Sequence, residues 1–190
     1  MLVRKAWCFF EQSGTFRDKF KEFGIEAFDC DIQNEYGKTD FNIDLFEEIH
    51  KAYECDQSIF DKIDSDDLIF AFFPCTRFTK QAELLFKQVG KIFCHKSEYD
   101  KISAAMQAER ERLDLFIIFS EMVQVCIQKK IKIIIENPYS TDHYLVRYFP
   151  IKSKVIDFDR RERGDFFKKP TQYWFINCEP SYNMDALFNV

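Results

Sequence analysis

Apolar and polar positions along the N-terminal part of the chain fall in blocks that predict strands separated by a helix. The segments "VRKAWCFFE" (3–11) and "IEAFDCD" (25–31) have the short apolar or alternating patterns of strands. Between them, "SGTFRDKFKEFG" (13–24) repeats phenylalanine at spacings of four and three residues, which is typical of an amphipathic helix. Gly24 stands where a glycine commonly ends such a helix.

Two longer apolar runs, "DDLIFAFFP" (66–74) and "KIKIIIENP" (130–138), predict strands that are buried on both sides. The rest of the pattern predicts a helix over 42–55, a long helical stretch over 100–130 and shorter strands at 154–158 and 171–177. Strands that alternate with helices predict an α/β fold with a mostly parallel, Rossmann-like central sheet and helices on both faces.

Composition limits the class of protein further. A chain of 190 residues fits a single domain, 1–190, and the net charge of −5 is unlike that of a protein that binds duplex DNA tightly and unaided. The basic clusters at 128–132 and 159–169 have the composition of ordinary solvated surface as well.

Seven cysteines without a C-x-x-C pair predict reduced thiols and no structural metal. The N-terminus has neither a leader nor an anchor pattern, so we expect a cytoplasmic protein with no membrane partner.

Candidate chemistry gathers just past the predicted strands. Ligands of open parallel sheets bind at the carboxyl ends of the strands, so polar residues there are expected to meet at one edge. These residues are Glu11 to Gly14, Asp31, Asp44, Pro74, Cys75, Glu136 and Asn137.

Each of the first three positions also has an ordinary structural interpretation. The turn at 9–18 suits a cradle of backbone amides for a cofactor, or a tight turn with Ser13 as the helix cap. It has one glycine, which is a poor dinucleotide fingerprint. Asp31 suits ribose hydroxyls or a solvated strand end, and Asp44 suits the edge of a base or a helix cap.

Cys75 and Glu136 are the two candidates for catalysis. Taken alone, a cysteine after a proline is more often a small buried residue, but this position at the ligand edge suits a thiol whose pKa a helix N-terminus lowers. Glu136 directly follows three isoleucines, so burial is expected to raise the pKa of its carboxyl group. Such a group can donate a proton or hydrogen bond near neutral pH, and its alternative is a salt-bridged strand end.

Together these segments resemble the DNA cytosine-5 methyltransferase family. "FEQSGTFR" (10–17) is similar to the cofactor loop Phe-x-Gly-x-Gly-Gly-Phe-Arg, with Gln12 and Thr15 in place of two glycines. "DDLIFAFFPCTRFT" (66–79) is similar to Asp-x-x-x-x-Gly-Phe-Pro-Cys-Gln-x-Phe-Ser, and "IENP" (135–138) resembles the Glu-Asn-Val segment. "NID" (42–44) is similar to the Gly-Asp-Ile segment that reads the adenine of the methyl donor. The set resembles most closely a compact phage and prophage version without a target-recognition domain.

The resemblance implies a methyltransferase fold in which residues 5–140 carry the motifs and 141–190 complete the sheet. It implies that S-adenosylmethionine is held by Glu11, Ser13, Gly14, Thr15, Phe16, Asp31, Asp44 and Pro74. It implies that Cys75 adds to carbon 6 of a pyrimidine while Glu136 bonds the ring nitrogen. The residues expected to contact substrate are Asn137, Arg161 and Arg163. The two arginines stand near the place of the family's Gln-x-Arg-x-Arg segment.

Three functions remain open at this point. The first is a minimal methyltransferase, because the 54 residues after Glu136 are too few for the family's target-recognition domain. It would act on single-stranded or exposed DNA, on a nucleotide, or with a protein partner that supplies recognition. The second is a methyltransferase fold kept for binding, for example a phage factor that acts on a host defence system in the host cytoplasm. The third is a nucleotide-binding oxidoreductase, which would need a glycine-rich turn that this chain lacks.

Overall fold

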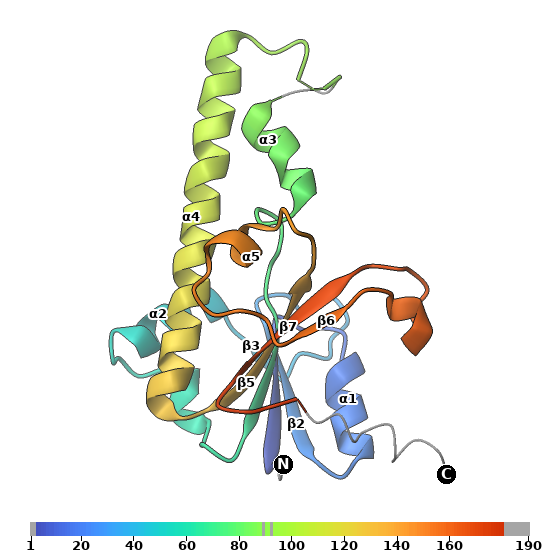
Figure 1. The fold of residues 1–190 in the computed structure, drawn as a ribbon. Helices are drawn as coiled ribbons and strands as arrows, with labels where there is room; N and C mark the ends of the chain where they lie inside the picture. The colour runs from blue at the N-terminus through green and yellow to red at the C-terminus, as the bar shows by residue number, and fades with distance from the viewer. Residues whose placement is uncertain (1–2, 89, 92, 181–190) are drawn as a thin grey trace.

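The structure, a computed structural model, describes residues 3–180 with the exception of residues 89 and 92. Seven strands form one sheet in the order β3-β2-β1-β4-β5-β7-β6 (Figure 1). Their bounds are β1 (Lys5–Phe9), β2 (Glu26–Asp31), β3 (Phe41–Asn42), β4 (Leu68–Phe72), β5 (Lys132–Pro138), β6 (Val155–Asp157) and β7 (Thr171–Ile176). β1 to β5 run parallel, whereas β7 runs antiparallel to both β5 and β6. The expected mostly parallel sheet is confirmed.

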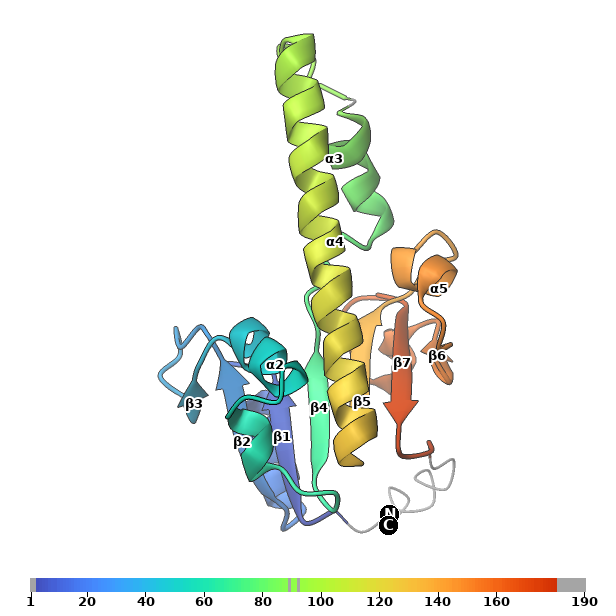
Figure 2. The same cartoon turned by 90° about the vertical axis from the view of Figure 1, so that its left-hand side faces the viewer.

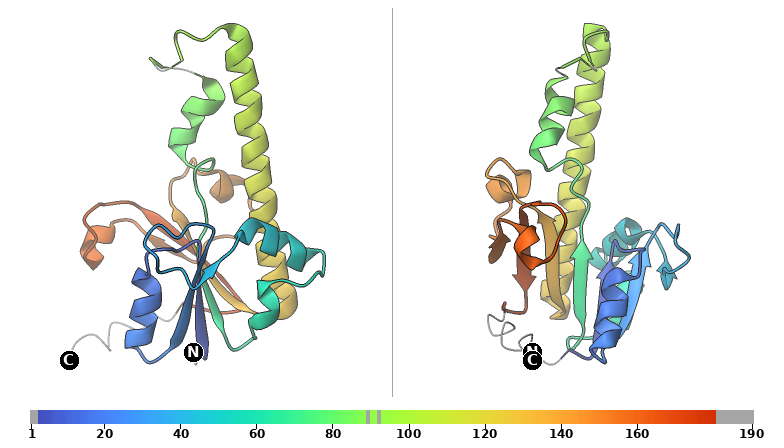
Figure 3. Two further views of the ribbon diagram at one scale, coloured as in Figure 1. Left: turned by 180° about the vertical axis from the view of Figure 1, so that it is seen from behind. Right: turned by 90° about the vertical axis from the view of Figure 1, so that its right-hand side faces the viewer.

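Helices cover both faces of this sheet. α1 (Thr15–Glu22) lies on one face, and α2 (Leu45–Tyr53) and α4 (Glu98–Lys129) lie on the other (Figures 1 and 3). The shorter helical elements are η1 (Ile59–Lys62), η2 (Lys80–Ala82), α3 (Glu83–Lys87), α5 (Tyr144–Tyr148) and η3 (Arg160–Arg163). No helix among the described residues is long and apolar enough to cross a bilayer.

The main core lies between the sheet and α4. Ile69, Ile133 and Ile135 from the central strands belong to the same buried cluster as Phe119 and Met122 of α4. Burial of each such side chain stabilises the fold by about 1.5–3 kcal/mol. Phenylalanine is common in this cluster, and the edge of the Phe119 ring meets Phe73, Phe149 and Trp174.

Two local departures from the expected elements have clear causes. The segment predicted as a helix over 42–55 begins with the short strand β3, and α2 starts only at Leu45. Asp44 sets that start, because its carboxylate accepts hydrogen bonds from the amides of Phe46 and Glu47. β7 returns antiparallel beside β5 through long-range pairing, which no local pattern encodes.

The long helix α4 does not end at the edge of the sheet. Its N-terminal half projects beyond the α/β body, and α3 packs beside that projection (Figure 2). The C-terminal half of α4 packs on the sheet through Phe119, Met122 and Cys126. One helix therefore serves both as a layer of the domain and as the core of an arm.

Candidate functional site

The parallel strands bring the predicted site residues to one edge of the sheet. β1, β2, β4 and β5 end at this edge, and Glu11, Asp31 and Cys75 stand at or just after the ends of the first three. Glu136 lies inside β5, opposite Phe72 of β4 in the parallel register. The edge contains a group of residues around the first turn and a second group around Cys75 and Glu136.

The first turn depends on one glycine. Gly14 is buried, has φ of 79°, and precedes α1 as its N-cap. This left-handed conformation favours glycine, and a Cβ at this position would also lie 2.8 Å from Nη2 of Arg17, so that side chain would have to shift. The backbone N–H of Ser13 donates to Oε1 of Glu11 at 2.6 Å, and Oγ of Ser13 accepts from the backbone N–H of Thr15, the first residue of α1, at 3.2 Å. Gly14 stands at the N-cap position, so Ser13 bonds the first helical amide from one residue before the cap, close to the structural role expected for it.

Gln12 closes this turn from outside. Its Nε2 donates to Oε1 of Gln33 at 2.8 Å, and its Oε1 accepts from the backbone N–H of Glu35 at 3.0 Å. The side chain that replaces a glycine of the resembled loop therefore ties the first turn to the turn after β2. The sequence signalled the replacement, but the partner lies more than 20 residues away.

Asp31 and Asp44 differ in how far their carboxylate oxygens are already engaged in hydrogen bonds within the protein. Asp31 is half-buried at the end of β2 and accepts a hydrogen bond from the amide of Gln33 at 2.7 Å. Burial raises the pKa of its carboxyl group, and the charge of Glu11 acts in the same direction. Asp44 serves as the cap of α2, which is the structural alternative to its expected contact with adenine.

Asp29 is a buried acid that the sequence analysis did not single out. It is fully buried in β2, and its Oδ2 lies 3.8 Å from Nη1 of Arg17. Burial raises its pKa to about 6, although the Arg17 charge opposes the shift. The only signal in the sequence was an acid at an inward position of an alternating strand.

Asp29 is expected to make stability fall as the pH rises. Because its pKa in the folded state, about 6, exceeds the ordinary 3.8, the folded protein binds this proton more tightly than the unfolded chain. The contribution of Asp29 to the free energy of unfolding is therefore most favourable below about pH 4, and it falls by about 3 kcal/mol as the pH rises through 6. Asp29→Asn should remove this decline, measured by urea unfolding at several pH values. Asp56→Asn, at an exposed aspartate, should keep it. Identical pH dependence in Asp29→Asn and the wild type would contradict the assignment.

Cys75 is half-buried in the loop that follows β4. The turn at 76–78 comes next, closed by a hydrogen bond from the Phe78 amide to the Cys75 carbonyl, and no helix N-terminus meets the thiol. Burial raises the pKa of the thiol and the charge of Glu136 raises it further, while Lys169 opposes both. The expected lowering of this pKa by a helix is therefore wrong, because desolvation and a neighbouring acid prevail.

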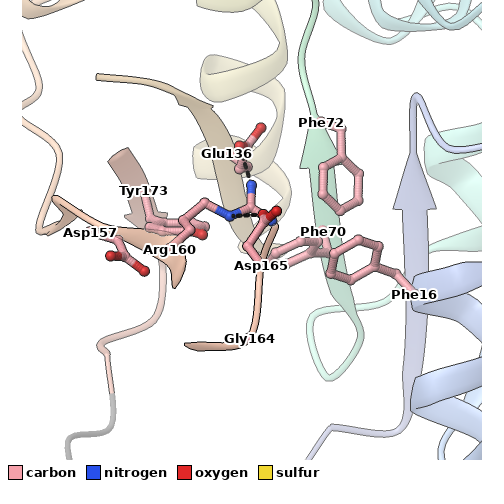
Figure 4. Close-up of a pocket in the computed structure, with 9 residues that line it drawn as sticks. All are labelled: Phe16, Phe70, Phe72, Glu136, Asp157, Arg160, Gly164, Asp165 and Tyr173. Atoms are coloured by element: carbon pink, nitrogen blue, oxygen red, sulfur yellow. Dashed lines mark ion pairs between the residues drawn. The ribbon is translucent and has the colours of Figure 1, made fainter. Parts of the chain in front are cut away.

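Glu136 has the expected electrostatic character. Its side chain is buried, and this burial raises the pKa of the carboxyl group despite the charges of Lys169 and Arg160. Figure 4 shows the Arg160 guanidinium between the carboxyl groups of Glu136 and Asp165. Its Nη1 lies 3.5 Å from Oε1 of Glu136, and its Nε lies 2.9 Å from Oδ2 of Asp165. The sequence analysis missed Arg160, although it lies in the basic run that was noted at 159–169.

Asn137 supports the loop that carries Cys75. It is fully buried, and its Nδ2 donates to the carbonyl of Phe73 at 2.7 Å. This bond fixes the chain immediately before Pro74 and Cys75, half-buried residues at the exit of β4. The structure thus gives Asn137 a positioning role, and its expected contact with substrate stays a prediction.

Two cavities lie on either side of this group. The smaller, of about 340 Å³, is drawn in Figure 4 and is lined by Phe16, Phe70, Phe72, Glu136, Asp157, Arg160, Gly164, Asp165 and Tyr173. The larger, of about 920 Å³, is lined by residues that include Cys75, Thr76, Pro138, Tyr139, His143 and Lys169. Cys75 and Glu136 therefore line different cavities, although the charge of Glu136 raises the pKa of the Cys75 thiol.

Phe16 joins the first turn to this second group. Its ring lies 4.4 Å from Phe72 and 5.4 Å from Phe70, measured between ring centroids, so α1 reaches the wall of the Glu136 cavity. Arg161 is exposed and pairs with Asp159, and it lines neither cavity. The side chain of Arg163 lies outside the part of the chain that the structure describes.

His143 is a further residue that the sequence analysis missed. It is buried beside Phe78, and burial lowers its pKa to about 4, so the ring is neutral at pH 7. Neither ring nitrogen has a hydrogen-bond partner among the described residues. A lone histidine in a polar loop gave no pattern by which this could be predicted.

No protein-family model matches the chain, and no curated protein is significantly similar to it. Within residues 3–180, no group of three or more His, Cys, Asp or Glu side chains gathers in a way that could hold a metal ion. Function must therefore be inferred from the geometry of this edge and from the motifs in the sequence.

Proposed function

We propose that this chain is an S-adenosylmethionine-dependent methyltransferase-like protein that acts on carbon 5 of cytosine, or of a related pyrimidine, through Cys75. One observation carries the proposal. Cys75 and Glu136 come from the ends of the neighbouring strands β4 and β5, and they lie close enough for the charge of Glu136 to raise the pKa of the thiol. A nucleophile and a buried acid that acts on it at the ligand edge are what addition to a pyrimidine requires.

The sheet order supports this proposal over the oxidoreductase. The common dinucleotide-binding sheet has six parallel strands in the order 3-2-1-4-5-6. Here the antiparallel strand β7 lies between β5 and β6. The first turn also has the single glycine Gly14 and lacks the glycine-rich fingerprint that lets the backbone approach a pyrophosphate closely.

The chain's own residues have distinct parts in the proposed chemistry. The Cys75 thiolate adds to carbon 6, and the electron pair of the carbon 5–carbon 6 double bond becomes available at carbon 5. Protonated Glu136 donates to the ring nitrogen and offsets the charge that develops there. Loss of the carbon 5 proton to water later expels the thiolate, which restores the enzyme. Asn137 holds the Phe73 carbonyl and thereby the loop that carries the nucleophile.

The residues around the first turn fit the methyl donor in part. S-adenosylmethionine would supply an electrophilic methyl group. Asp31 offers a half-buried carboxylate to ribose hydroxyls, and Glu11 lies near enough to raise the pKa of Asp31. Gly14 precedes α1 as its N-cap, and Phe16 of that helix lines the smaller cavity. The side chain of Gln12 crosses this region, so donor binding must displace its bonds to Gln33 and Glu35.

That same bridge favours the second candidate, a methyltransferase fold kept for binding to a host protein. Gln12 already ties the first turn, and Asp44 already caps α2, so fewer polar groups are left to bind the methyl donor. The raised pKa of Cys75 acts in the same direction, because it lowers the thiolate fraction at neutral pH.

Calorimetry with S-adenosylmethionine tests the proposal. We expect the wild type to bind and Asp31→Asn to weaken binding by about tenfold or more, since a hydrogen bond to a charged group is lost. Gln12→Gly should bind more tightly than the wild type because no bridge has to open. Asp56→Asn is the control and should bind like the wild type. Absence of binding in both the wild type and Gln12→Gly would refute the proposal and leave the binding protein.

A further inference from the structure

The outer face of α4 carries a row of apolar side chains that nothing in the described chain covers. The exposed fractions of these residues are 79 % for Tyr99, 62 % for Ile102, 52 % for Met106, 55 % for Leu113 and 43 % for Ile117. Their spacings of three, four, seven and four residues place them on one side of the helix. Figure 2 shows α3 packed along one side only of the projecting arm. Single exposed apolar residues are ordinary, but a continuous row of this kind marks an interaction surface.

The opposite side of the arm is already occupied. Ala108 is buried there, and the guanidinium of Arg112 lies 4.9 Å from the Phe86 ring of α3 and 4.3 Å from the Tyr144 ring of α5. Glu111 pairs with Arg77 in the loop after β4. The fold therefore uses one side of α4 for its own packing and leaves the apolar row on the other.

The row is symmetric about a point between Glu109 and Arg110. Ile102 precedes this point by as many residues as Ile117 follows it, and the same holds for Met106 and Leu113. The two residues at the centre carry opposite charges. An antiparallel copy of the same helix would therefore meet apolar residues with apolar residues, and each central charge with its opposite.

We propose that a second copy of this chain docks antiparallel on the outer face of α4 and forms a two-fold symmetric dimer. Ile102 then meets Ile117 of the second copy, Met106 meets Leu113, and Glu109 meets Arg110. A two-fold interface must be complementary to itself, which is the property that this row has. The paired segment, residues 102–117, is about 23 Å long at the rise of an α-helix.

The internal contacts of Glu109 are compatible with this pairing. Glu109 forms an ion pair with Arg112 through Oε2, which leaves Oε1 for Arg110 of the second copy. Tyr99 lies beyond the paired segment and would pack near Ser120 of the second copy. The proposal does not depend on the methyltransferase function, because none of these residues lines either cavity.

Light scattering coupled to size-exclusion chromatography tests the dimer with the full chain over a range of concentrations. We expect the wild type to approach the mass of two chains as its concentration rises. Glu109→Arg places arginines opposite each other and Arg110→Glu places glutamates opposite each other, so each should raise the dissociation constant at least tenfold. The double variant Glu109→Arg/Arg110→Glu exchanges the charges and should dimerise like the wild type.

Gln124→Arg is the matched control, since it adds a charge to an exposed position of α4 outside the paired segment and should leave the mass unchanged. The double variant also guards against misfolding, because it contains both substitutions and must recover the dimer. A wild type that stays monomeric at every concentration overturns the proposal. Single variants that dimerise normally, or a double variant that stays monomeric, overturn it as well.

Discussion

Cys75→Ser is expected to abolish both labelled methyl transfer and covalent capture of a substrate that contains 5-fluorocytosine. Addition of the thiolate to carbon 6 is the step that makes carbon 5 nucleophilic, and a serine hydroxyl is too weak a nucleophile to replace it. With fluorine at carbon 5 the proton that must leave is missing, so the adduct to Cys75 persists. Mass spectrometry of the intact protein after incubation with the fluorinated oligonucleotide or nucleotide and S-adenosylmethionine detects this adduct.

Cys178→Ser is the matched control for that experiment. Cys178 is also a half-buried thiol whose pKa is raised by burial, but it lies after β7 and lines neither cavity. It should transfer methyl groups and form the adduct as the wild type does. Turnover that survives undiminished in Cys75→Ser would remove the assignment of the nucleophile. An adduct on Cys75 with the free nucleotide but not with the oligonucleotide would identify the smaller substrate.

The sequence predicted the strands and the edge where the candidate residues gather because both depend on local pattern. Continuous apolar runs ended at Pro74 and Pro138, and their parallel arrangement was enough to bring Cys75 near Glu136. The elevated pKa of Glu136 also followed from the isoleucines that precede it. These expectations required only neighbouring residues and the general rule for parallel sheets.

Other features of the site depend on contacts between distant segments, which a single sequence does not reveal. Arg160 reaches Glu136 from η3, between β6 and β7, and Lys169 acts on Cys75 from the segment before β7. The prediction for the Cys75 thiol failed for this reason: the local pattern indicated a strand exit, whereas the pKa is set by burial and by Glu136. The methyltransferase activity itself stays a prediction.

Glu136→Gln is expected to lower turnover by about 10²- to 10³-fold while making Cys75 more reactive. The loss follows because an amide cannot supply the proton that offsets charge on the ring nitrogen. The gain follows because the Glu136 charge raises the pKa of Cys75, so its removal lowers that pKa. Rates of iodoacetamide alkylation at fixed pH measure the second effect, in a background where the exposed Cys55 and Cys94 are serine. An unchanged melting temperature distinguishes this role from general loss of structure, which would also lower turnover and expose the thiol but would lower the melting temperature.

The pH profile of the same variant gives the sharpest test of how the pair works. In the productive form Glu136 carries a proton and Cys75 is a thiolate. Burial raises the pKa of both groups, and the thiol keeps its proton to a higher pH than the carboxyl group does. The productive form is therefore the less populated arrangement of the single shared proton. In the wild type this form is a constant small fraction between the two pKa values, so the rate falls on either side. In Glu136→Gln only the thiol titrates, so the rate should rise to a plateau and lose its alkaline decline. Glu179→Gln, at an exposed acid after β7, should keep the bell-shaped profile. An alkaline decline that persists unchanged in Glu136→Gln would show that another group holds the catalytic proton.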